Sequence, residues 1–217
     1  MNCPFKLIIL DLGNVLINFN HWIAANKFAK FSPKKLDYIY NLLFDSKLTH
    51  RFEEGKLEPQ DFFLAVKGDL ELKLDYNQFI PIWNEIFFLT SDNVGVYQLV
   101  KTLKERFKVV LLSNINRLHF EYLKDNFKIF DPFDKIVTSY EVGLRKPDAK
   151  IYQYALNLFS FLPSDAFYID DRSDLIEEAR RLSIAGAQFK SLESLKPVLE
   201  SVSILEPQKD QLVKNNP

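Results

Sequence analysis

Short apolar runs alternate with apolar positions at helical spacing along most of the chain. Five runs predict strands, and the first three are continuous enough to be buried parallel strands: Phe5–Leu10, Phe107–Leu112, Ala166–Ile169, Ile136–Ser139 and Gly186–Phe189. Helical spacing predicts helices over residues 96–103, 118–125, 151–158, 175–182 and 192–202. This alternation predicts right-handed βαβ units and an α/β fold in which helices cover both faces of a parallel sheet.

The pattern changes between the first and second predicted strands. Three helix starts follow one another there, at Ser32-Pro33, Glu58-Pro59 and Asp75. Pro81 lies inside the third helical pattern and is expected to kink or end it. Because the stretch shows no strand pattern, we predict an α-helical insert over residues 18–89. The α/β unit would then comprise residues 1–17 and 90–205, and the polar residues 206–217 would form a flexible tail.

Composition narrows the classes of function. The 217 residues carry a formal net charge of −1, which argues against a nucleic-acid partner. Cys3 is the only cysteine, so the chain can form neither an internal disulfide nor a cysteine-based zinc site. No apolar run approaches the ~20 residues of a membrane span. We therefore expect a cytoplasmic protein with no membrane partner, and the oligomeric state stays open.

Polar residues end the buried strands. Asp11 follows the first strand, Ser113 ends the second, and Asp170-Asp171 ends the third. The carboxyl ends of parallel strands share one edge of a sheet, so these groups are expected to converge there. Three neighbouring carboxylates repel one another unless protons or a cation offset their charge. Oxygen ligands favour Mg²⁺, which also binds phosphate oxygens. The alternative is that they are solvated loop carboxylates.

Two further segments fit a phosphate site. Lys146 precedes Pro147, which we interpret as the first residue of a helix, so Lys146 would lie where an anion binds well. Ser113 and Asn114 offer a hydroxyl, an amide and backbone N–H groups, although either could instead cap the following helix. The three histidines show no metal-ligand spacing, and the absence of a Gly-rich loop argues against a nucleotide cofactor.

Together these segments resemble the four motifs of the haloacid dehalogenase-like superfamily, in order: Asp11–Val15, Ser113-Asn114, Gly143–Asp148 and Tyr168–Asp171. The residues of these motifs are most similar to those of the small-molecule phosphatase subgroup that contains glucose-1-phosphate phosphatase. The resemblance covers nearly the whole chain. It implies a doubly wound, Rossmann-like core with a helical cap inserted after the first motif.

The resemblance also implies roles for the motif residues. Asp11 would be the nucleophile that becomes an aspartyl-phosphate. Ser113 and Asn114 would hold the phosphate oxygens, and Lys146 would bridge nucleophile and phosphate. The neutralising cations would let a carboxylate attack a dianion.

The same resemblance implies a Mg²⁺ site. Its ligands would be Asp11, the backbone carbonyl of Gly13, Asp171, and Asp170 either directly or through water. Phosphatases of the family usually carry an Asp two residues after the nucleophile as general acid and base, but this chain has Gly13. Such help is worth about 10²–10⁴-fold in rate.

Three explanations of Gly13 remain open. The substrate could have a good leaving group, such as an anomeric or acyl phosphate. A cap residue such as His21 or His50, or a water, could replace the acid. Turnover could also be poor.

The favoured hypothesis is a Mg²⁺-dependent phosphatase of a small phosphorylated metabolite, with a sugar phosphate as one candidate. The alternatives are a catalytically weak phosphate- and metal-binding module or scaffold, and a 2-haloacid dehalogenase. The dehalogenase would leave the paired carboxylates without a purpose.

Overall fold

The computed structural model describes residues 3–206, and the part of the predicted tail from residue 207 onward lies outside them. A five-stranded sheet with the order β5-β4-β1-β6-β7 forms its centre, and every neighbouring pair is parallel. The strands are β1 (Leu7–Leu10), β4 (Lys108–Ser113), β5 (Lys135–Thr138), β6 (Ala166–Asp170) and β7 (Ala185–Gln188). All four residues of β1 are buried, as expected for the central strand of a sheet covered on both faces.

Alternate residues of the strands feed two hydrophobic cores. Ile8 and Leu10 point to one face and Leu7 and Ile9 to the other. The first core is closed by α6 (Ser91–Leu103), α7 (Arg117–Asn126) and α11 (Leu192–Ser201), and the second by α9 (Ala149–Asn157) and α10 (Ser173–Arg181). The predicted doubly wound α/β sheet is therefore confirmed. Short α8 (Ser139–Val142) and the 3₁₀ turn η2 (Pro163–Asp165) lie in connections.

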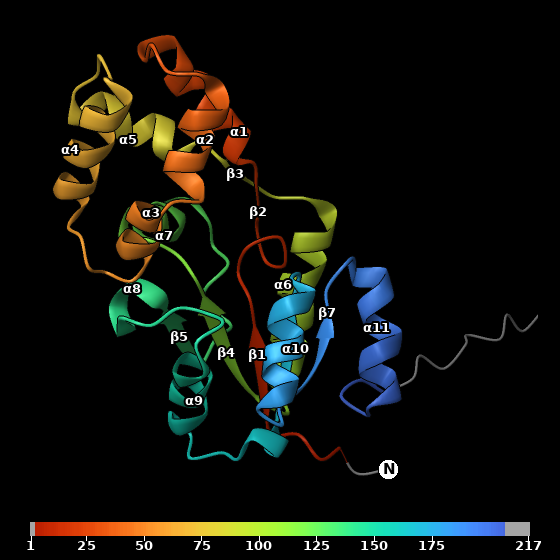
Figure 1. Cartoon of the computed structure of the whole chain (residues 1–217). Coiled ribbons are helices and arrows are strands. Elements are labelled where there is room, and N and C mark those ends of the chain that lie inside the picture. The colour runs from red at the N-terminus through yellow and green to blue at the C-terminus, as the bar shows by residue number, and fades with distance from the viewer. Residues whose placement is uncertain (1–2, 207–217) are drawn as a thin grey trace, which may run out of the picture.

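A separate group of helices lies beyond the carboxyl ends of the strands (Figure 1). It comprises α1 (His21–Phe28), η1 (Ala29–Phe31), α2 (Leu36–Phe44), α3 (Lys47–Glu53), α4 (Pro59–Leu70) and α5 (Tyr76–Asn84). These helices pack on a third core whose buried residues all fall between Ala24 and Ile86. We call residues 20–86 the helical unit.

The segment between residues 18 and 89 is not entirely helical. Strands β2 (Asn18–Phe19) and β3 (Phe87–Phe88) pair antiparallel and form a two-stranded ribbon where the chain enters and leaves the helical unit. Two residues per strand are too few to produce a period-two pattern, so hydrophobicity alone did not predict this ribbon.

Ser32 does not cap the helix that follows it. α2 begins at Leu36 after Lys35, while the Ser32 hydroxyl donates to the carbonyl of Leu70 and accepts from the Lys34 N–H. The predicted cap at Asp75 is present as a capping box with Gln78. The sequence interpretation did not identify α1 and α3, which each have at most eight residues.

Helix α5 continues through Pro81 to Asn84. A proline has no N–H to donate to the carbonyl four residues earlier. Here that carbonyl belongs to Asn77, which is exposed, so water can donate to it instead. The expected break is therefore absent. Among the described residues, no helix combines the length and the apolar character that crossing a membrane requires.

Candidate active site

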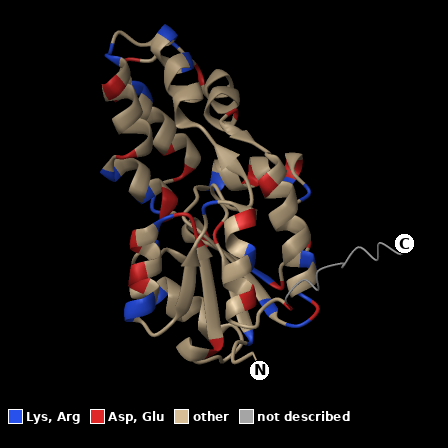
Figure 2. Ribbon diagram, turned by 90° about the vertical axis from the view of Figure 1, so that its right-hand side faces the viewer, with Lys and Arg blue, Asp and Glu red and all other residues tan. Residues whose placement is uncertain are grey.

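Three neighbouring strands bring the predicted polar residues together. Asp11 directly follows β1, Asp170 ends β6, and Ser113 ends the adjacent β4. One oxygen each of Asp11, Asp170 and Asp171 lies within 4.8 Å of the others. Figure 2 shows acidic and basic residues side by side at this edge, below the helical unit. The three carboxylates therefore lie together at this edge, as the sequence predicts, and form one cluster.

Lys146 lies between two of these carboxylates. Its Nζ is 2.6 Å from Asp11 Oδ1 and 2.8 Å from Asp170 Oδ2, and the residue is only 2% exposed. Burial lowers the pKa of its ammonium, but the charges of Asp11 and Asp170 outweigh burial and raise it. Lys146 is therefore a fixed positive charge inside the cluster.

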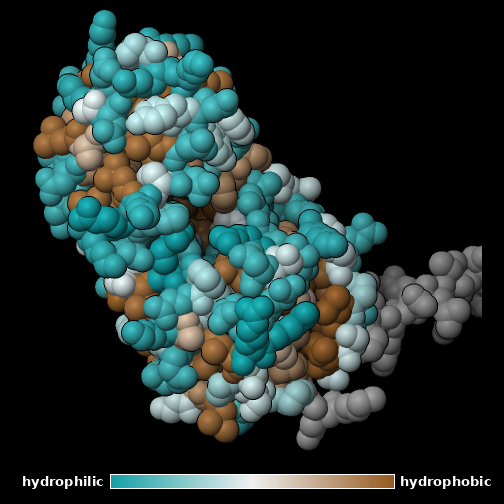
Figure 3. Space-filling view, viewed as in Figure 1, coloured by the Kyte–Doolittle hydropathy of each residue, from teal (hydrophilic) through white to brown (hydrophobic). Residues whose placement is uncertain are grey.

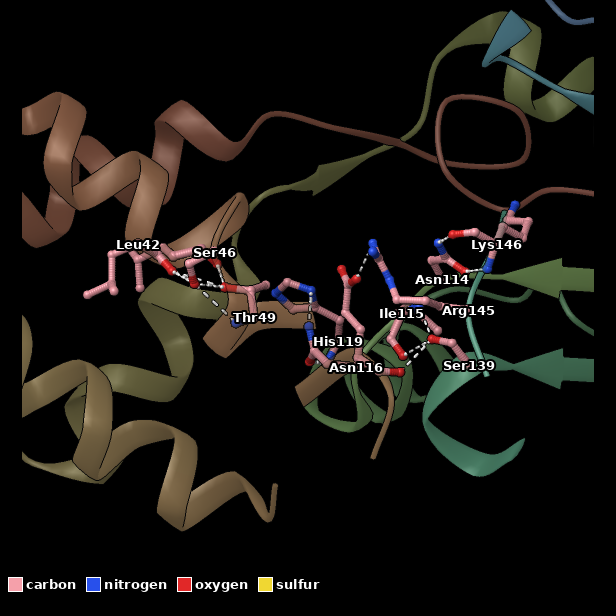
Figure 4. A network of polar contacts seen from close by, with 12 residues as sticks. Leu42, Ser46, Thr49, Asn114, Ile115, Asn116, His119, Ser139, Arg145 and Lys146 are labelled. Atoms are coloured by element: carbon pink, nitrogen blue, oxygen red, sulfur yellow. Dashed lines mark hydrogen bonds and ion pairs between the residues drawn. The ribbon is translucent and has the colours of Figure 1, made fainter. Parts of the chain in front are cut away.

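Asn114 positions the backbone of this lysine. Its side-chain Nδ2 donates to the Lys146 carbonyl over 2.9 Å, and its Oδ1 accepts from the Lys146 N–H over 2.8 Å, as Figure 4 shows. Helix α9 begins only at Ala149 with Asp148 as its cap, so the prediction that Pro147 opens a helix is wrong. The two hydrogen bonds from the Asn114 side chain, and not a helix N-terminus, therefore position the backbone of Lys146.

Burial and like charges raise the pKa of Asp11. The pKa of its carboxyl rises from 3.8 to about 7, because burial and the charges of Asp170 and Asp171 outweigh the lowering effect of Lys146. Burial, together with Asp170, also raises the pKa of Asp171 despite a hydrogen bond from Asn14. One lysine does not offset three carboxylates, so the cluster favours a further cation.

Asp170 and Asp171 have partners that the sequence did not reveal. Asn14 Nδ2 donates to Asp171 Oδ2 over 2.9 Å. Asp170 Oδ1 accepts from the Arg172 N–H, and Asp170 Oδ2 accepts from the Tyr168 hydroxyl as well as from Lys146. Asn14 and Tyr168 lie inside the motif segments, but only the folded chain shows which carboxylate each contacts.

Phe19 fills the space beside Gly13. A Cβ atom added to Gly13 would lie 2.7 Å from Cε1 of the Phe19 ring. Gly13 does not have a positive φ, so its backbone conformation would accept a side chain. The obstacle at this position is the Phe19 ring. A ring from β2 therefore occupies the place where the family's usual Asp would begin.

A cavity of about 290 Å³ opens onto the cluster. Its base is formed by Asp11, Gly13, Ser113, Lys146 and Asp171, and the helical unit contributes other lining residues. Figure 3 shows a hollow between the helical unit and the sheet, with hydrophobic side chains in its depth. The site therefore holds charged groups at one end and is covered by the helices.

All three histidines line this cavity, and burial lowers the pKa of each. Burial lowers the pKa of His21 to about 4 and that of His119 to about 3. His119 is held on both ring nitrogens, by Asn116 Nδ2 and the Trp83 carbonyl. An amide N–H donates to Nδ1, so Nε2 carries the proton. Burial also lowers the pKa of His50, which is less buried.

The end of α3 joins the helical unit to the loops of the sheet. The Arg145 Nη2 donates to Glu53 Oε2 over 3.0 Å, and the Ser139 hydroxyl donates to the Glu53 carbonyl over 2.6 Å. Burial raises the pKa of Glu53, and the charge of Arg145 opposes that rise. Because Arg145 precedes Lys146, these contacts connect the helical unit directly to the carboxylate cluster.

Comparison with known proteins identifies the family. A family model described as haloacid dehalogenase-like hydrolase matches residues 5–182. The chain belongs to the haloacid dehalogenase-like hydrolases. The resemblance of its four motif segments is thereby confirmed, and this haloacid dehalogenase-like protein is a hydrolytic enzyme.

Curated relatives of this hydrolase include two phosphatases. It is 25% identical over 187 residues to a sesquiterpene phosphatase of Aspergillus oryzae, covering 86% of this chain and 90% of the relative. It is 25% identical over 194 residues to a D-ribitol-5-phosphate phosphatase of Bacteroides thetaiotaomicron, covering 84% and 91%. A drimenol cyclase of Aspergillus calidoustus is 27% identical over 199 residues, but the match spans only 36% of that relative's length.

Solved structures of the family show the same fold. The HAD family enzyme bt-2542 of Bacteroides thetaiotaomicron, in complex with magnesium and inorganic phosphate, superposes with a TM-score of 0.77 at 25% identity. The match covers 89% of this hydrolase and 98% of that chain.

Proposed function

We propose that this hydrolase is a Mg²⁺-dependent phosphatase that acts on a small phosphorylated metabolite through an aspartyl-phosphate on Asp11. The observation that carries the proposal is the cluster of Asp11, Asp170 and Asp171 with the buried Lys146 inside it. The two phosphatases among the relatives and the magnesium and phosphate of the bt-2542 complex support it. Residues 18–89 would be the cap and residues 1–17 and 90–205 the core.

The residues present fit a divalent cation. Asp11, Asp171 and the carbonyl of Gly13 would hold it, and all three residues line the cavity. Asp170 would contribute through a water or a remaining lone pair, because Lys146, Tyr168 and the Arg172 N–H already bind its oxygens. A bound Mg²⁺ would neutralise charge on the phosphate and lower the pKa of Asp11 again.

The first half-reaction would use Asp11 as nucleophile. One oxygen of its carboxylate forms a bond to phosphorus while the ester P–O bond breaks and its electron pair leaves with the alkoxide. Lys146 offsets the charge of the two anions as they meet. The Ser113 hydroxyl and the backbone N–H of Asn114 would donate to phosphate oxygens, because the side chain of Asn114 is already bound to Lys146.

The second half-reaction would restore the carboxylate. Water attacks the phosphorus of the aspartyl-phosphate, the bond between phosphorus and the Asp11 oxygen breaks, and inorganic phosphate leaves. Since Gly13 carries no acid, the leaving alkoxide would take its proton from water in the cavity. This arrangement predicts slow turnover of esters whose alcohols are poor leaving groups.

Removal of metal tests the proposal directly. With a panel of phosphate esters, phosphate release is expected to require Mg²⁺, to stop in excess EDTA and to return when Mg²⁺ exceeds the chelator. EDTA saturated beforehand with Mg²⁺ is the control. Full activity in excess EDTA would remove the metal from the mechanism. Absence of turnover across the panel would instead favour a phosphate-binding module.

The affinity for Mg²⁺ is expected to fall as pH is lowered below about 7, the pKa of the metal-free Asp11 carboxyl. A ligand must lose its proton to bind a cation, so the dissociation constant should rise by up to about tenfold per pH unit. The raised pKa of Asp171 acts in the same direction. Calorimetric titration at several pH values measures this. Asp11→Asn should flatten the dependence, and an equally steep dependence in that variant would assign it to another group.

Gly13→Asp is expected to need a second change before it helps catalysis. Alone, the new side chain must displace the Phe19 ring, so we expect lower stability and little gain in rate. Combined with Phe19→Leu, the new carboxyl gains room to act as general acid. Rates on alkyl phosphates should then rise about 10²-fold or more, and rates on aryl phosphates much less. Initial rates on both ester classes measure this, with Phe19→Leu alone as control, and equal gains would contradict it.

A further inference from the structure

One wall of the cavity is a closed ring of aromatic side chains. Neighbouring centroids lie 4.0–6.4 Å apart through the complete cycle, which comprises Phe19, His21, Phe44, Trp83, His119 and Phe87. All of its members except Trp83 line the cavity. We call this set the aromatic wall. It joins β2 and β3 to the four helices α1, α2, α5 and α7, so the wall forms only in the folded chain.

The aromatic wall offers a bound substrate few polar partners. Both ring nitrogens of His119 are already held within the protein. Burial keeps His21 uncharged near neutral pH, and its ring stacks on Phe44 with an interplanar angle of 6°. The surface turned to the cavity is therefore largely ring carbon.

The wall reaches the reacting end of the site. Phe19 lies against Gly13, two residues after the proposed nucleophile, and takes the space of a side chain there. The first atoms of the leaving group beyond the phosphate would therefore meet an aromatic ring. Glu53 and Arg145 also line the cavity, and they are paired with each other.

From this geometry we infer that the cavity selects phosphate monoesters of apolar alcohols, with an aryl or prenyl group beside the phosphate, over esters of polyols. The inference rests on the proposed phosphatase function and names its substrate class. An apolar group gains by leaving water and packing on the rings. A hydroxyl placed against the ring carbons of Phe19, Phe44 or Phe87 loses its water and finds no partner there, which costs about tenfold in affinity.

The test compares two primary alkyl phosphates, so that leaving-group acidity differs little. We expect kcat/KM with Mg²⁺ for 2-phenylethyl phosphate to exceed that for ribitol 5-phosphate by at least about tenfold, mainly through KM. Phe44→Leu should narrow this ratio by about threefold or more. Phe31→Leu, an exposed ring of the helical unit outside the wall, should leave the ratio unchanged.

Inhibition of the wild-type enzyme provides a readout that depends on no variant. 2-Phenylethylphosphonate should inhibit at least about tenfold more tightly than methylphosphonate. If both esters turn over and ribitol 5-phosphate is preferred, or if the phosphonates inhibit equally, the inference on substrate class is wrong while the phosphatase proposal stands. If no ester of either class turns over, the proposed function itself fails.

Discussion

Asp11→Asn is expected to reduce phosphate release by about 10⁴-fold or more, as removal of a nucleophile does in other covalent enzymes. The amide is nearly isosteric but cannot attack phosphorus. The fold should survive, because the change removes one of three clustered carboxylates and leaves Lys146 paired with Asp170. Phosphate release with saturating Mg²⁺ measures the loss, and circular dichroism verifies the fold.

Asp174→Asn is the matched control for this variant. Asp174 lies four residues beyond Asp170, and its side chain is 61% exposed in a pair with Arg172. An exposed ion pair of this kind contributes little to stability, so the variant should fold normally and its activity should stay close to that of the wild type. If Asp11→Asn kept more than about a tenth of the activity, covalent catalysis by Asp11 would be excluded.

Lys146→Met is expected to reduce both activity and stability. The variant keeps most of the apolar stem of the side chain but leaves Asp11 and Asp170 buried without their shared cation. Breaking a buried ion pair from one side costs about 3–5 kcal/mol of the free energy of unfolding. Denaturant titration of the metal-free protein measures this loss, and turnover should fall by at least about 10³-fold.

The stability deficit of Lys146→Met should depend on pH. Without the lysine, the folded-state pKa of Asp11 rises even further above its ordinary value of 3.8. Below about pH 7 Asp11 is protonated in both folded proteins and carries no penalty, so its part of the deficit relative to the wild type is lost as pH falls to about 7 and grows as pH rises above 7. Mg²⁺ should restore part of the stability. Lys150→Met, at an exposed position nearby, should hardly change the free energy of unfolding. A loss as large as that of Lys146→Met would refute the electrostatic account.

The sequence predicted the parts of the site that local patterns encode. Buried strands of four to six residues produce continuous apolar runs, so the ends at Asp11, Ser113 and Asp170 could be placed before the fold was known. Parallel strands share an edge, so convergence followed from topology alone.

Contacts between distant segments could not be predicted in this way. The bond between Asn114 and Lys146 joins residues 32 positions apart, and nothing in either segment indicates that the amide holds the lysine's backbone. Phe19 and Gly13 are close in sequence, yet their packing depends on a ribbon of two-residue strands. The prediction that Pro147 starts a helix failed for a different, local reason, since Asp148 caps α9 by accepting from the Lys150 N–H.

The independence of the third hydrophobic core has an evolutionary consequence. Its buried residues come from one continuous stretch between Ala24 and Ile86, whereas the groups proposed to carry the chemistry are anchored by the sheet. Mutations that repack these helices can therefore change the shape of the substrate cavity while the groups proposed to be catalytic keep their positions. Related enzymes can therefore evolve different substrate specificities while they keep the same catalytic residues.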